Sequence, residues 1–192
     1  MRSLPQFEIK PKGSISNLFI ENNIFNLDQA IDFIRKLPYG RNANKRDLTT
    51  LFGDACGTCS TKHALLKQLA DENSVPEIKL FIGLFKMNGL NTPIILTTLK
   101  KYGLEYMPEA HCYLKYKDII LDCTFENSKA SDFMDDLIEE IEIAPTQILG
   151  FKQKYHKNYL DKWLKENLEI DYSPDEFWSI REQCIFDLQN HN

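Results

Sequence analysis

A β-hairpin pattern in the middle of the chain restricts the folds that this sequence can adopt. Residues 111–116 and 119–125 are rich in strand-forming side chains, and Lys117-Asp118 provides a two-residue turn between them. The apolar run at residues 78–87 predicts a further strand that is buried on both faces. The middle of the chain is therefore predicted to be rich in β-structure.

Helical patterns precede these strands. Asn26 resembles the N-cap of a helix with an apolar stripe, and Pro38 ends that helix. A second helix is predicted to begin near Thr58 or Cys59, and apolar side chains at residues 64–70 give it one buried face.

Helical patterns also follow the first strand. Residues 92–102 predict a helix inserted between two strands. From residue 131 onward the pattern is helical, with a short interruption at residues 141–145, and Ser173 is the predicted N-cap of the last helix. Helices, then strands, then helices predict an α+β fold.

Length and composition narrow the function classes. A chain of 192 residues favours one domain over residues 1–192. The net charge of -5 argues against a nucleic-acid partner, and the basic cluster at residues 41–46 is interpreted as a solvated loop rather than a phosphate site. No apolar run approaches the ~20 residues of a membrane helix, and the first residues lack the apolar core of a secretory signal. We therefore expect a cytoplasmic protein with no membrane partner.

Cysteine placement supplies a candidate nucleophile. The chain has 5 cysteines, and an odd number without an export signal argues against a disulfide framework. Cys59 lies at the start of a predicted helix, where unpaired N–H groups and the helix dipole favour the thiolate that attacks carbonyl groups. The alternative for this residue alone is an inert, buried cysteine.

The hairpin register supplies the partners of that nucleophile. With a two-residue turn, Tyr116 faces Ile119 and His111 lies opposite Thr124. His111 and Asp122 then share one face of the hairpin as diagonal neighbours, ~7–8 Å apart at Cα, so their side chains can meet. Nucleophile, imidazole and orienting carboxylate are the parts that covalent catalysis requires. Taken singly, His111 also fits a core histidine and Asp122 a strand-end cap.

Three ordered blocks resemble the transglutaminase-like superfamily of cysteine enzymes, which have a papain-like core. Gly57-Thr58-Cys59 resembles the start of the nucleophile helix, residues 75–83 resemble the entry into the next strand, and residues 111–116 through 121–124 resemble the histidine and aspartate strands. The resemblance covers residues 53–125, so residues 1–52 and 126–192 are predicted helical extensions. The interval of 11 residues between His111 and Asp122 is shorter than is common in the family, and Cys123 replaces its usual proline.

The resemblance implies an antiparallel sheet and a catalytic triad. Cys59 is the implied nucleophile, His111 the general base and acid, and Asp122 the residue that orients the imidazole. The implied reaction is acyl transfer or amide hydrolysis on a peptide or small-molecule amide, without a metal or organic cofactor. The backbone N–H of Cys59 is a candidate oxyanion donor, and Asn42 and Asn44 are polar candidates for a second one.

A redox function is one alternative. Cys56 and Cys59 form a CxxC at a helix start, which resembles the thioredoxin site, and Thr92-Pro93 would then correspond to its cis-proline. That interpretation leaves the hairpin residues without a role.

Two further alternatives remain. A zinc site could use Cys56, Cys59 and His63, completed by another cysteine or histidine of the hairpin: His111, Cys112 or Cys123. His63 also lies one turn after Cys59 on the same helix face, where it fits a packing role or contact with the thiolate. A non-catalytic binding protein could retain the same fold.

Overall fold

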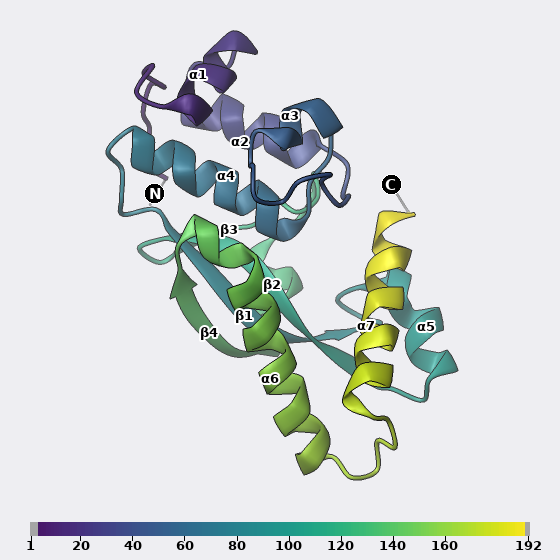
Figure 1. Cartoon of the computed structure of the whole chain (residues 1–192). Helices are drawn as coiled ribbons and strands as arrows, with labels where there is room; N and C mark the ends of the chain where they lie inside the picture. Colours follow the sequence, from purple (N-terminus) through teal and green to yellow (C-terminus); the bar gives the residue numbers. More distant parts are fainter. Residues whose placement is uncertain (1–3, 191–192) are drawn as a thin grey trace.

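The sheet has four strands, and every adjacent pair is antiparallel. The computed structural model describes residues 4–190, in which the strands are β1 (Lys79–Asn88), β2 (Tyr106–Tyr116), β3 (Ile119–Leu121) and β4 (Leu137–Ile143). Their order across the sheet is β3-β2-β1-β4, so the two longest strands occupy the centre. The fold is α+β, as predicted, with helices on both the N-terminal and the C-terminal side of the sheet in the sequence (Figure 1).

The hairpin register agrees with the prediction. Tyr116 pairs with Ile119 and Leu114 with Leu121, and Lys117 has a φ of 54°, as two-residue hairpin turns require at a central position. β2 begins five residues earlier than expected because it continues along β1 as far as the Asn88–Tyr106 pair. β3 ends at Leu121, so Asp122 lies just beyond the last strand pair.

Four helices precede the sheet: α1 (Ser14–Glu21), α2 (Leu27–Lys36), α3 (Thr50–Asp54) and α4 (Cys59–Glu72). Asn26 caps α2 by accepting a hydrogen bond from the backbone N–H of Gln29, as the sequence predicts. Apolar side chains of these helices form one core with the sheet face that carries Leu80, Ile82 and Cys112. This packing fixes α4, and therefore Cys59, against the centre of the sheet.

The opposite sheet face meets the later helices: α5 (Leu96–Lys101), α6 (Gly150–Glu166) and α7 (Pro174–Gln189). The predicted helix over residues 92–102 is present as a short 3₁₀ turn, Pro93–Ile95, followed by α5. Ser173 caps α7 through a capping box with Glu176, as predicted. Figure 1 shows α6 running across the sheet and α7 beside α5.

The prediction of helix from residue 131, interrupted only at residues 141–145, was wrong for its first part. Residues 137–143 form the edge strand β4, preceded by two short 3₁₀ turns. Ile141 and Ile143 pair with Ile82 and Leu80 of β1, and this tertiary pairing outweighs the helical preference of the glutamates between them. Within residues 4–190, no helix combines the length and the apolar character needed to cross a membrane.

Candidate active site

Cys59 is the first residue of α4. Thr58 is the N-cap and forms a capping box with Thr61, which satisfies backbone N–H groups at the helix start. Cys59 itself is 7% exposed and lies where the helix dipole favours a negative charge. The local sequence therefore places the thiol at the end of a rigid, well-capped helix.

His111 and Asp122 meet as the hairpin register predicts. Nε2 of His111 lies 2.9 Å from Oδ2 of Asp122, whose side chain is 5% exposed. Thr124 donates to the other carboxylate oxygen, Oδ1, from its backbone N–H at 2.8 Å and from its hydroxyl at 2.6 Å. Burial opposes the Asp122 carboxylate, but His111 and these hydrogen bonds outweigh it and lower the pKa of Asp122 to about 2.

The charges indicate a thiolate–imidazolium pair. A hydrogen bond with Cys112 lowers the pKa of Cys59 most, burial raises it, and Lys152 and His111 lower it further, so that the net pKa is well below its usual value. Burial also opposes the His111 imidazolium, but Asp122 and the Cys59 sulfur raise its pKa to about 10. Because Nε2 of His111 binds Asp122, Nδ1 is the ring atom left for Cys59.

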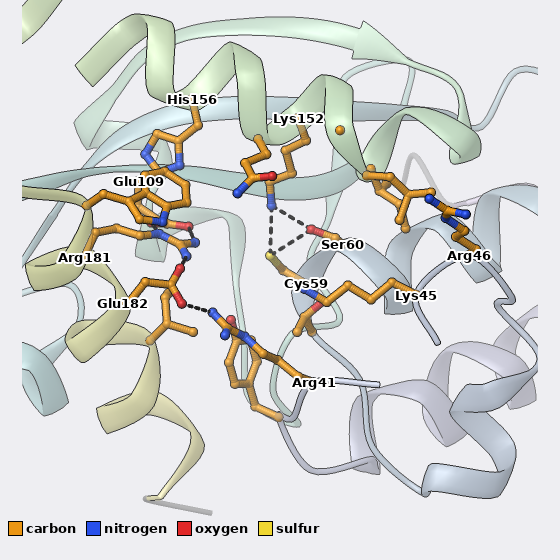
Figure 2. Close-up of a pocket in the computed structure, with 18 residues that line it drawn as sticks. Arg41, Lys45, Arg46, Cys59, Ser60, Glu109, Lys152, His156, Arg181 and Glu182 are labelled. Atoms are coloured by element: carbon orange, nitrogen blue, oxygen red, sulfur yellow. Dashed lines mark hydrogen bonds and ion pairs between the residues drawn. The ribbon is translucent and has the colours of Figure 1, made fainter. Parts of the chain in front are cut away.

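Lys152 is a third partner of the sulfur, and sequence reasoning missed it. It comes from the first turn of α6, and its Nζ lies 3.8 Å from Sγ of Cys59 and 2.6 Å from the hydroxyl oxygen of Ser60 (Figure 2). Its burial opposes the ammonium, but Cys112 and Cys59 raise its pKa, so the charge is retained. No local pattern around residue 152 marks it; only the packing of α6 brings it to the site.

His63 has a structural role. Its Nδ1 lies 2.7 Å from the carbonyl oxygen of Cys59, and its Nε2 accepts a 2.7 Å hydrogen bond from the backbone N–H of Cys123. Burial lowers its pKa to about 4 despite the nearby Asp122, so the ring is neutral. With both nitrogens engaged, His63 connects the start of α4 to the segment that carries the aspartate and does not act on the thiol.

Asn42 also has a structural role. Its amide nitrogen donates to the carbonyl oxygen of Cys56 at 2.9 Å and to Asp54 at 3.2 Å, and its amide oxygen accepts from the Thr61 hydroxyl at 2.7 Å. These bonds hold the loop before α4 and leave the side chain no donor for an oxyanion. Asn44 uses its side-chain oxygen to accept from the backbone N–H of Arg46.

Two cavities meet at Cys59. One has a volume of about 470 Å³ and extends past Ser60 and Lys152 toward charged side chains of the 41–46 loop and α7 (Figure 2). The other has a volume of about 240 Å³ and contains His111 and Asp122 in its wall. Apolar side chains form much of its remaining wall, among them Phe85, Met87, Phe125, Phe133, Ile185 and Leu188. A substrate at Cys59 can therefore extend in two chemically different directions.

The metal and redox alternatives find less support in this geometry. No cluster of three or more metal-ligating His, Cys, Asp or Glu side chains occurs within the described residues, and the ring nitrogens of His63 already face backbone groups. Cys56 is a free thiol whose pKa is raised by burial and by Asp54, in contrast to Cys59. Every peptide bond of residues 4–190 is trans, including the one before Pro93.

Comparison with protein-family models, with curated proteins and with solved structures gave no match. The function is therefore inferred from the side chains themselves.

Proposed function

We propose that this chain is a thiol-dependent acyltransferase or amidase of transglutaminase-like type, with Cys59, His111 and Asp122 as its triad. The observation that carries the proposal is the His111–Asp122 hydrogen bond of 2.9 Å beside a thiol at a helix N-terminus. A buried carboxylate that keeps a histidine protonated next to a thiol of lowered pKa is the arrangement expected of a catalytic pair.

The first half-reaction forms a thioester. The Cys59 thiolate attacks the carbonyl carbon of an amide or ester, and the carbonyl oxygen becomes an oxyanion. The backbone N–H of Cys59 and the Lys152 ammonium, which lies 3.8 Å from Sγ, are the candidate donors to that oxygen. Protonated His111 then gives its Nδ1 proton to the leaving amine or alcohol, and the bond from the carbonyl carbon to that group breaks.

The second half-reaction releases the acyl group. Neutral His111 accepts a proton from water or from an amine as either attacks the thioester carbon, and the Cys59 thiolate leaves. Asp122 keeps Nε2 of the ring protonated and holds its orientation throughout. Hydrolysis and transfer differ only in the acceptor that enters the cavity.

Mass spectrometry after brief treatment with iodoacetamide tests this proposal. We expect selective labelling of Cys59 at pH 6, where an ordinary thiol with a pKa of ~8.5 is almost entirely protonated. Cys59→Ala is expected to abolish turnover of 4-nitrophenyl esters, and Cys56→Ala is the matched control that keeps it. A Cys56–Cys59 disulfide in the isolated protein, with turnover lost in both variants, would instead support the redox function.

A further inference from the structure

The larger cavity beside Cys59 is strongly cationic. Two acidic side chains and five basic ones line it: Glu109, Glu182, Arg41, Lys45, Arg46, Lys152 and Arg181. The basic side chains come from the 41–46 loop, α6 and α7, so three separate parts of the chain direct positive charge to the same space (Figure 2).

Both carboxylates of the cavity are already paired. Arg181 binds Glu109 through Nε at 2.7 Å and Nη2 at 2.5 Å, in a bidentate pair with little exposure. Glu182 accepts from Arg41 at 2.5 Å and from Arg181 at 2.7 Å. These four side chains balance one another, and the Cys59 thiolate balances Lys152.

Lys45 and Arg46 are the two basic residues of this cavity that have no acidic partner in it. Within residues 4–190, neither side chain has a carboxylate at ion-pair distance. Desolvation lowers the pKa of Lys45, and the positive charges of Arg41, Lys152 and Arg181 lower it further. Both side chains are exposed, as expected for a solvated loop, but they also line the cavity. An unbalanced pair of cations at the edge of a substrate cavity is a favourable position for an anion.

The other cavity indicates which part of the substrate carries that anion. His111, the proton donor to the leaving group, lines only the apolar cavity, so the leaving group departs on that side. The acyl group that stays on Cys59 then extends past Lys152 into the cationic cavity.

We infer that the acyl group transferred by Cys59 carries an anionic group, a carboxylate or a phosphate, that Lys45 and Arg46 bind in the cationic cavity. This inference rests on the proposed function, because it requires Cys59 to be the nucleophile. It specifies the substrate class as amides or esters of acids that have a second, negatively charged group.

Paired alkylating reagents test this inference without a known substrate. In iodoacetate and iodoacetamide, the thiolate attacks the same CH₂ carbon and iodide leaves, and only iodoacetate brings a negative charge. The measured quantity is the ratio of the iodoacetate rate to the iodoacetamide rate at Cys59, divided by the same ratio for 2-mercaptoethanol. We expect it to be about 10 at low ionic strength and to fall with added salt.

The matched variants are Lys45→Gln/Arg46→Gln and Lys154→Gln/Lys165→Gln, which remove the same charge. Lys154 and Lys165 are exposed on α6 and lie outside the cavity wall. The first variant is expected to lower the ratio about 3- to 10-fold, and the second to leave it unchanged. If both reagents label Cys59 rapidly but the rate ratio equals that of 2-mercaptoethanol, or changes equally in both variants, the anion site is refuted. The nucleophile role of Cys59 is unaffected by that outcome. If Cys59 reacts with neither reagent, both the proposed function and this inference fail.

Protection against iodoacetamide distinguishes the two anions. Succinate that slows labelling at a lower concentration than inorganic phosphate indicates a carboxylate, and the reverse order indicates a phosphate. If chloride at equal ionic strength protects as well as either, no anion site exists and the inference is wrong.

Discussion

Lys152→Met removes the ammonium group 3.8 Å from the Cys59 sulfur and keeps a buried, unbranched side chain. Opposite unit charges at that distance attract by ~4 kcal/mol at an effective dielectric constant of ~20 and by ~1 kcal/mol in water. Both groups are buried, so the loss should lie between these limits. A thiolate destabilised by ~1–4 kcal/mol is ~5- to 1000-fold less populated at a pH below its titration.

The labelling rate should change less than the thiolate population. A less acidic thiol gives a more nucleophilic thiolate, with a Brønsted slope of ~0.4–0.5. The change in the logarithm of the labelling rate is therefore about half of the change in the logarithm of the thiolate population. We therefore expect iodoacetamide to label Cys59 ~3- to 30-fold more slowly in Lys152→Met than in the unmodified chain, at a pH below the titration of Cys59 in both proteins. Lys152→Arg should retain most of the rate, and Lys154→Met should retain all of it. An unchanged rate in Lys152→Met, with the fold intact by circular dichroism, refutes the electrostatic role of Lys152.

The remaining predictions concern the histidines and the aspartate. Asp122→Asn should slow turnover of a 4-nitrophenyl ester by more than 10-fold, but by less than the ~10⁴-fold loss that the equivalent change causes in a serine-protease triad. The control variant Asp118→Asn, at the turn, should keep the rate within twofold. Equal losses in the two variants contradict the orienting role of Asp122. Because the pKa of His111 is raised to about 10, kcat/KM for a 4-nitroanilide should fall as the pH rises through about 10, and a fall near 6.5 contradicts the ion pair. Protonated His111 also stabilises the fold. This stabilisation is complete at a pH below the ordinary histidine pKa of ~6.5 and is lost as the pH rises through about 10. The free energy of unfolding in urea should therefore be lower at pH 10.5 than at pH 7. His63→Leu leaves the buried amide of Cys123 without its acceptor and should lower the free energy of unfolding by ~1–3 kcal/mol, which the same urea titration measures; no loss means that the bond is dispensable.

Local sequence carried enough information for the His111–Asp122 contact and the helix start at Cys59, but not for their surroundings. The two-residue turn at Lys117-Asp118 determines which side chains share a face. The contact between His111 and Asp122 follows when that register is extended one residue past β3. The helix start at Cys59 follows from the capping preference of Thr58. Both are short-range consequences of residue type.

Long-range packing supplied what the sequence pattern did not reveal. β4 is a strand because it pairs with β1, and its glutamates alone favour a helix. Lys152 reaches Cys59 only because α6 crosses the sheet. Lys45 is a candidate anion-binding residue only because it lines a cavity that three distant segments form. Neither position has a neighbour in the sequence that predicts its partner.

The separation of Cys59 from Lys152 also bears on how the chain matures. During synthesis at ~5–20 residues per second, the chain takes about 5 to 20 s to grow by the 93 residues from Cys59 to Lys152. Throughout that interval the nascent chain contains a cysteine without the ammonium group that helps to ionise it. Under the proposed function, the Cys59 thiol is fully activated only after α6 has docked. An incomplete or misfolded chain would then be a weak nucleophile.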